Sequence, residues 1–166
     1  MPRPLVAHID LSALRHNLGV ARRHAPQSHT MAVIKANGYG HGVLRAARAL
    51  EAAEGFAVLN VSEAVALREA GFKQTILLLE GFFSADELSA LAEHRLASVV
   101  HCAEQIEMLE ASGLSVKLDI FLKINTGMNR LGFKPEAFTA ALDRLQSCPA
   151  VGTITLMTHV ASADEA

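Results

Sequence analysis

The chain has 166 residues, of which 51% are hydrophobic, so it can bury a core of its own and is expected to form one domain. Its 15 Lys and Arg residues nearly balance its 17 Asp and Glu residues, and it contains no basic run of the kind that follows a phosphate backbone. We therefore expect no nucleic-acid partner. No apolar run is long enough to span a bilayer, and we expect no membrane partner.

The amino-terminal segment and the cysteines indicate the compartment. Asp10 and Arg15 interrupt the apolar residues of the first segment, which therefore lacks the core of a signal peptide. Cys102 and Cys148 lie far apart in the sequence, which favours reduced thiols over a disulfide. We expect a cytoplasmic protein.

Along the chain, short aliphatic runs alternate with segments in which apolar residues recur at helical spacing. A first helix is expected at about residues 11–25. Strands are expected at 31–36, 56–60, 75–80, 97–101, 117–125 and 152–159, and further helices at 43–54, 62–71, 84–94, 103–112 and 135–147. Ser62, Ser84 and Pro135 suit helix starts, and Gly71 and Gly113 suit helix ends.

This alternation predicts an α/β protein with a parallel sheet. Two architectures fit: a doubly wound open sheet, or a (β/α)8 TIM-type barrel truncated to about six parallel strands with surrounding helices. A complete barrel needs roughly 250 residues. A barrel of this length would therefore be incomplete.

Polar residues at the carboxyl ends of the expected strands are the first candidates for a site, because working residues gather there in parallel α/β folds. Lys35 closes the first strand, Lys123 nearly closes the fifth, and His159 closes the sixth. A lysine at an apolar strand end is costly to desolvate unless it is paired, deprotonated or covalently used. The alternative for each lysine is a solvated side chain at the strand end.

Strand alternation divides the last two strands into an aliphatic and a mixed face. Four residues of the fifth strand should face helices, and the alternate four should face the other side. The first set is Leu118, Ile120, Leu122 and Ile124, and the second is Asp119, Phe121, Lys123 and Asn125. In the sixth strand Thr153, Thr155, Met157 and His159 should oppose Ile154, Leu156 and Val160. A polar face of this kind favours a barrel lumen with a ligand at its mouth, since a strand buried on both sides is continuously hydrophobic.

Two unusual loops follow the lysines. NGYGHG, after Lys35, runs into a helix and could offer backbone N–H groups to an anion, although it matches neither a dinucleotide nor a P-loop pattern. TGMNRLGF, after Lys123, brings Arg130 to the same end of the sheet. Arginine suits a carboxylate, phosphate or phenolate oxygen, although most loop arginines face solvent.

Four blocks of the sequence together resemble alanine racemases, in the same order and at similar separations. They are HIDLSALRHNL (8–18), IKANGYGHG (34–42), LKINTGMNRLGF (122–133) and LMTHVASADE (156–165). The resemblance implies a pyridoxal 5'-phosphate enzyme of fold type III, a barrel followed by a mostly β domain, working as a head-to-tail homodimer. It further implies that residues 1–166 are the amino-terminal part of the barrel domain, without the carboxyl-terminal β domain.

Residue by residue, the resemblance implies the following roles. Lys35 matches the lysine that forms an aldimine with the cofactor and acts as one of two acid/base groups, and Tyr39 matches a phosphate contact. Lys123 matches a lysine that is commonly carbamylated and orients Arg130, which lies near the cofactor's phenolic oxygen and the substrate carboxylate. His159 matches a histidine packed on the pyridine ring.

The implied activity is racemisation of L- and D-alanine, for cell-wall D-alanine supply or alanine catabolism, with no metal. Many members of the family have aspartate where this chain has Asn125, outside the roles just given. The family's second base is a tyrosine of the partner subunit's carboxyl-terminal domain, and the only tyrosine here is Tyr39. The chain is therefore expected to be truncated, and by itself to racemise alanine far more slowly than its full-length counterpart. Alternatives are a non-catalytic pyridoxal-phosphate-binding homeostasis protein, an inactive remnant, and another racemase or decarboxylase on this fold.

Overall fold

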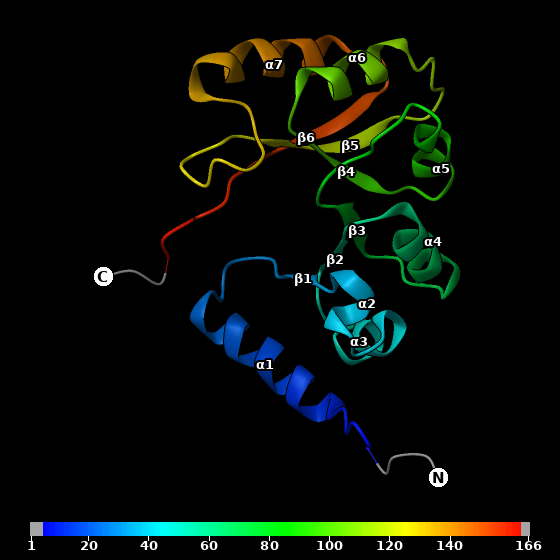
Figure 1. Cartoon of the computed structure of the whole chain (residues 1–166), viewed down its shortest axis with the longest axis vertical. Helices are drawn as coiled ribbons and strands as arrows, with labels where there is room; N and C mark the ends of the chain where they lie inside the picture. Colours follow the sequence, from blue (N-terminus) through cyan, green and yellow to red (C-terminus); the bar gives the residue numbers. More distant parts are fainter. Residues whose placement is uncertain (1–4, 164–166) are drawn as a thin grey trace.

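The computed structural model describes residues 5–163, so the end of the LMTHVASADE block lies outside the described residues. Its sheet has six parallel strands paired in chain order (Figure 1). They are β1 (Met31–Val33), β2 (Gly55–Val58), β3 (Thr75–Leu78), β4 (Ala97–Val100), β5 (Leu118–Lys123) and β6 (Val151–Met157). A doubly wound sheet reverses its strand order at a switch point, whereas a barrel wall adds each strand beside the last. The unbroken order confirms an unclosed TIM-type barrel wall.

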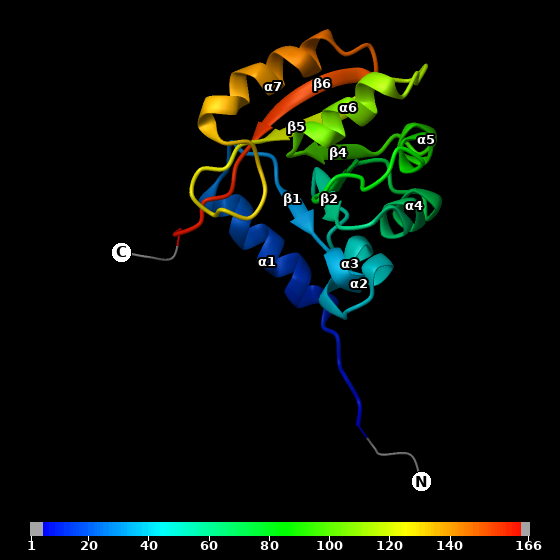
Figure 2. The same cartoon turned by 45° about the horizontal axis from the view of Figure 1, so that its top comes forward.

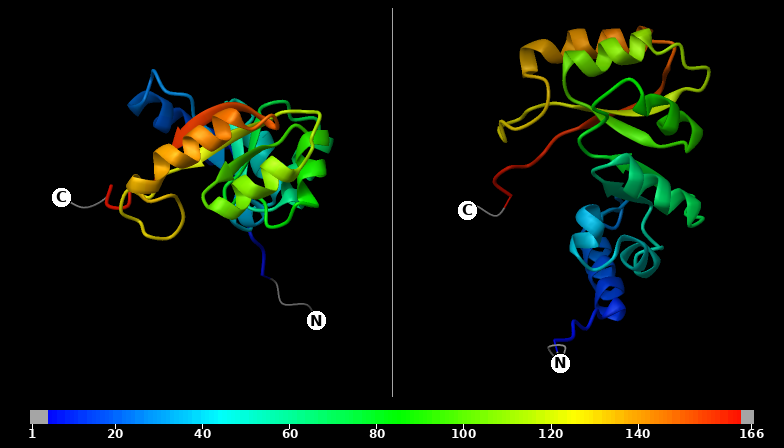
Figure 3. Two further views of the ribbon diagram at one scale, coloured as in Figure 1. Left: turned by 90° about the horizontal axis from the view of Figure 1, so that it is seen from above. Right: turned by 45° about the vertical axis from the view of Figure 1, so that its right-hand side comes forward.

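The helices lie mainly along the outer side of this curved wall (Figure 2). They are α1 (Leu11–His24), α3 (Val43–Ala49), α4 (Val61–Glu69), α5 (Glu87–Glu93), α6 (Ala103–Ala111) and α7 (Pro135–Ser147), and the short α2 (Lys35–Tyr39) follows β1. Helices α6 and α7 lie side by side (Figure 3), and Arg144 Nη2 contacts Glu110 Oε2 at 2.7 Å. Within residues 5–163, no helix combines the length and apolarity that a membrane crossing needs.

Capping residues explain where several helices begin and end. Pro135 is the first residue of α7, as expected, and Gly71 follows α4 at φ 94°. The expectation that Ser62 and Ser84 begin helices was wrong. Helix α4 begins at Val61, because the Asn60 side chain caps it by accepting from Glu63 N, and α5 begins only at Glu87.

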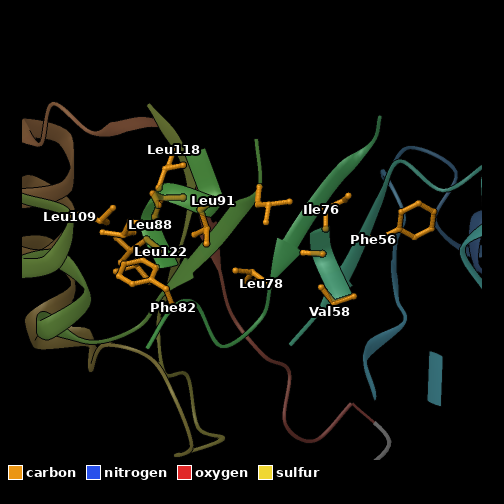
Figure 4. Packing of buried hydrophobic residues seen from close by; sticks show 14 of the residues in the cluster. Phe56, Val58, Ile76, Leu78, Phe82, Leu88, Leu91, Leu109, Leu118 and Leu122 are labelled. Carbon is orange, nitrogen blue, oxygen red and sulfur yellow. The ribbon is translucent and has the colours of Figure 1, made fainter. Parts of the chain in front are cut away.

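Side chains alternate between two hydrophobic clusters, one on each face of the sheet. Between sheet and helices lies the main core, which Figure 4 shows in part and which includes Phe56, Val58, Ile76, Leu78, Phe82, Leu88, Leu91, Leu109, Leu118 and Leu122. The inner face carries Ala57, Leu77, Ala97 and Val99, with Phe121 and Met157 packed against them. The expected split of β5 is confirmed for Leu118 and Phe121. In β6, Ile154 packs against the main core and Met157 against the inner cluster, also as expected.

Phe56 tests how much this core contributes to stability. Its side chain is fully buried and meets the Phe72 ring edge-on, with the centroids 5.3 Å apart. Phe56→Ala is expected to lower the free energy of unfolding by about 3–5 kcal/mol, because it removes buried contacts and leaves a cavity. The matched change Phe83→Ala, at a side chain that is 69% exposed, should cost less than about 0.5 kcal/mol. Urea unfolding measures both, and equal losses would contradict this assignment of the core.

Candidate active site

A cavity of about 340 Å³ lies at the carboxyl-terminal ends of the strands. All five residues that the sequence singled out as a site, Lys35, Tyr39, Lys123, Arg130 and His159, line it. The remaining lining residues are Val33, Leu59, Leu79, Glu80, Leu131 and Met157. The fold therefore brings together, at one end of the sheet, side chains that lie at or just after the carboxyl ends of β1, β3, β5 and β6.

Lys35 lies directly before a left-handed turn and not, as expected, at the end of a strand. Strand β1 stops at Val33, and α2 (Lys35–Tyr39) departs from regular helical geometry, with φ of 51° at Ala36, 54° at Asn37 and 53° at Tyr39. A residue other than glycine costs about 1–2 kcal/mol in this region. Strain of this kind is typical of functional sites. Lys35 and Tyr39, at the two ends of the turn, both line the cavity.

Three backbone amides of the NGYGHG loop donate to carbonyl groups in or next to the loop. Gly40 N donates to Ala36 O at 3.1 Å, His41 N to Gly38 O at 3.0 Å, and Gly42 N to Asn37 O at 2.8 Å. For these three amides, the expectation that they are available to an anion was therefore wrong. Of the loop's residues, Tyr39 lines the cavity.

Lys123 is the last residue of β5 and only 7% of it is exposed. Burial lowers its pKa below the ordinary value, and the positive charge of Arg130 lowers it further, whereas the Glu80 carboxylate raises it. No hydrogen bond or ion pair holds its amine among the residues that the structure describes. The site thus contains a buried amine that gives up its proton more readily than an ordinary lysine.

This bias predicts a pH dependence of stability. Because the pKa of Lys123 is lower in the folded protein than its ordinary 10.5, the unfolded chain binds more protons at this residue between the two values. The free energy of unfolding should therefore rise with pH across that interval, below 10.5. Lys123→Met lacks this contribution and should gain less stability over the same interval. Urea unfolding at a series of pH values compares them, and parallel profiles would contradict the burial argument.

Asn125 organises the loop that carries Arg130. Its Oδ1 accepts from Gly127 N at 3.1 Å and from Asn129 N at 3.0 Å, and its Nδ2 donates to Asn129 Oδ1 at 3.0 Å. A carboxylate at this position would lack the donor. Gly132 closes the loop at φ 121°, where an added Cβ would lie 2.7 Å from Asn125 N. Arg130 itself is exposed, so its position depends on this loop.

His159 lies two residues beyond the end of β6 and is exposed. The Thr126 hydroxyl donates to the His159 carbonyl at 3.3 Å and is hydrogen-bonded to the Thr158 hydroxyl. These contacts connect the His159 segment to the Arg130 loop. The two loops therefore present the imidazole and the guanidinium to the same cavity.

Two acidic residues at or beside the cavity were not found from the sequence. Glu80 lines the cavity, and its carbonyl accepts from His101 Nε2 at 3.0 Å and from Gln105 Nε2 at 3.2 Å. Its signal was a charged residue at a strand end, the same signal that identified the lysines. Glu63, on α4, accepts a hydrogen bond from Asn37 N at 2.6 Å. Its signal was weaker, because an acid in the first turn of a helix is common.

Comparison with known proteins places the chain in a family. The family described as "Alanine racemase, N-terminal domain" matches residues 9–166. An alanine racemase of Nitrosospira multiformis is 61% identical over 99% of this chain, and a catabolic alanine racemase of Klebsiella aerogenes is 54% identical. The structure of a biosynthetic alanine racemase from Pseudomonas aeruginosa superposes with a TM-score of 0.93, at 47% identity over 98% of this chain and 46% of that one.

The chain spans about half the length of the curated relatives it matches, 46% in the case of the Nitrosospira multiformis protein. The likeness extends to more distant structures, including the Clostridium difficile alanine racemase in complex with cycloserine, with a TM-score of 0.86 and 28% identity. The family match, the strand order and the clustering of the predicted site residues in one cavity agree. The chain belongs to the alanine racemase family.

Proposed function

We propose that this chain forms the amino-terminal part of the barrel of an alanine racemase, which interconverts L- and D-alanine with pyridoxal 5'-phosphate. The observation that carries the proposal is the meeting of Lys35, Tyr39, Lys123, Arg130 and His159 in one cavity of a chain of this family. The relatives are named alanine racemases, and the cavity supplies one of the two acid/base groups that inversion needs together with groups that suit the cofactor and a carboxylate. We expect the working enzyme to be a cytoplasmic homodimer.

The residues of the cavity fit the cofactor chemically. Lys35 supplies a primary amine for the cofactor's aldehyde, and the Tyr39 hydroxyl would donate to its phosphate. Arg130 would donate to the phenolic oxygen, and the His159 ring would pack on the pyridine. When bound, the cofactor would make the Cα proton of alanine removable by withdrawing electrons from that carbon.

The chain's own residues would then hold alanine and move its proton. The Lys35 amine would take the Cα proton on one face and return it on that face in the reverse direction. Arg130 would bind the alanine carboxylate, since a guanidinium and a carboxylate form paired hydrogen bonds. Inversion needs a second acid/base group on the opposite face, which we assign to the partner subunit.

Lys123 would act through Arg130. Its neutral amine would attack the carbon of CO₂, forming an N–C bond as one C–O π bond opens onto oxygen. One N–H bond would then break and release its proton to water, leaving a carbamate anion beside Arg130. An anion there would accept the arginine's N–H groups and fix its direction. The burial of Lys123 supports this role, because only the unprotonated amine reacts.

Glu80 is expected to restrain this carbamylation. Its carboxylate raises the pKa of Lys123, which keeps more of the amine protonated, and it would repel the carbamate once formed. Glu80→Gln should therefore increase the carbamate fraction on Lys123 at neutral pH, as measured by NMR with carbon-13 bicarbonate. Glu93→Gln, an exposed change at the end of α5, should leave the fraction unaltered, and Lys123→Met should abolish the signal. A carbamate fraction that is unchanged or lower in Glu80→Gln would refute this role.

D-alanine formation from L-alanine in the full-length protein, with and without added pyridoxal phosphate, tests the proposed function. The proposal predicts turnover that requires the cofactor. Cofactor binding without any D-alanine formation would overturn it in favour of a non-catalytic pyridoxal-phosphate-binding protein.

A further inference from the structure

The strained turn at residues 35–39 needs support from outside itself. Inside the loop, the Asn37 side chain accepts from Val43 N at 2.9 Å, which joins the turn to the start of α3. From outside, the Glu63 carboxylate reaches across from α4, and its Oε1 accepts from Asn37 N at 2.6 Å. This bond holds the backbone two residues after Lys35 and two before Tyr39, at the middle of the left-handed segment.

The Glu63 side chain is hydrogen-bonded to the turn and not to the start of its own helix. Glu63 is the third residue of α4, the position from which a glutamate usually reaches back to the N-cap backbone. Here Asn60 already caps the helix, accepting from Glu63 N at 2.9 Å, and the Glu63 carboxylate points to Asn37 instead.

The second oxygen of Glu63 supports the same reading. Oε2 is buried and has no hydrogen-bond partner among the residues that the structure describes. A buried carboxylate oxygen without a partner is unfavourable. Stabilising the start of α4 would not require this arrangement, because an exposed acid would serve equally well.

We propose that Glu63 is a positioning residue: by holding Asn37 it fixes the left-handed turn that directs the Lys35 amine and the Tyr39 ring into the cavity. This inference rests on the proposed function for the use of that amine, but the placement of the amine is testable without it. Glu63 does not line the cavity and acts only through the turn.

Three variants and three measurements test the proposal in the full-length protein. The variants are Glu63→Ala, Glu63→Gln and, as a matched control on the exposed end of α4, Glu69→Ala. The measurements are the hydrogen-exchange rate of the Asn37 amide, the reactivity of Lys35 toward acetic anhydride relative to the exposed Lys117, and the pyridoxal phosphate concentration for half-maximal borohydride capture on Lys35.

In Glu63→Ala, Asn37 exchange is expected to accelerate about tenfold or more, since a hydrogen bond to a charged group is lost. Lys35 should react faster with acetic anhydride because it is released to solvent, while half-maximal capture should need about tenfold more cofactor. Glu63→Gln keeps an acceptor oxygen, so its Asn37 exchange rate, Lys35 reactivity and half-maximal cofactor concentration should all stay close to the wild-type values. Glu69→Ala should match the wild type in all three. If Glu63→Ala acted only by destabilising the fold in general, Glu63→Gln would not be expected to return these values to the wild type.

Unchanged Asn37 exchange in Glu63→Ala would overturn the proposal, as would faster exchange with unaltered Lys35 reactivity. If Glu63→Ala does not fold, Glu63→Gln decides: its Asn37 exchange should stay near the wild-type rate, and a tenfold acceleration would overturn the proposal. A wild-type chain that fails to capture the cofactor on Lys35 would defeat the proposed function. The change in acetic anhydride reactivity would still support or overturn the role of Glu63.

Discussion

Replacing Lys35 with alanine is expected to lower alanine racemisation by at least about 100- to 10,000-fold, the usual cost of removing a general acid/base group. Because the variant also loses the amine that would bind the cofactor covalently, we expect the fall in racemisation to lie at the upper end of this range. The measurement is D-alanine formation by the full-length protein at saturating cofactor and L-alanine.

The matched control for this change is Lys117→Ala. Lys117 is exposed and lies just before β5, at the opposite end of the sheet from the cavity. It should retain wild-type turnover. If both variants were equally active, Lys35 could not be the base, and the assignment of the site would be wrong.

Replacing Arg130 with methionine is expected to lower kcat by about 100- to 1,000-fold, the cost typical of removing a positioned donor from a reacting site. The argument has two parts. First, methionine keeps an unbranched apolar stem but has no N–H to donate to the alanine carboxylate. Second, the carbamate on Lys123 would no longer have a guanidinium to orient.

Arg144→Met on α7 is the control for Arg130→Met. Arg144 also carries a partly exposed guanidinium, but it pairs with Glu110 on the outer face of the wall. Its loss should leave kcat unchanged. Arg130→Lys should recover only part of the activity, because an ammonium keeps the charge without the planar fork. Wild-type kcat in Arg130→Met would remove arginine from the mechanism.

The fold could be predicted largely from local patterns. Helix α7 begins and ends at the expected residues 135 and 147, because its proline start and its apolar spacing are both encoded locally. The face assignments of β5 follow from alternation alone. What local patterns left open was the choice between a doubly wound sheet and a barrel wall, since that depends on which strands pair.

The errors around Lys35 have a different origin. The run MAVIKA has strand-like composition, but Ala36 and Asn37 adopt positive φ, which no propensity predicts for alanine. That conformation is supported by Glu63, a residue on another element, so a local pattern could not reveal it. Glu80 was missed for a similar reason, because its effect on Lys123 depends on β3 and β5 ending at the same cavity.

The most direct test of the central claim is to locate the lysine that binds pyridoxal phosphate. The protein is incubated with the cofactor, treated with borohydride to make the bond between amine and cofactor permanent, and digested for peptide mapping. We predict that the label lies on the peptide containing Lys35, with Lys117 and Lys123 unmodified. Label on Lys117, Lys123 or another lysine, with Lys35 unmodified, would contradict the account.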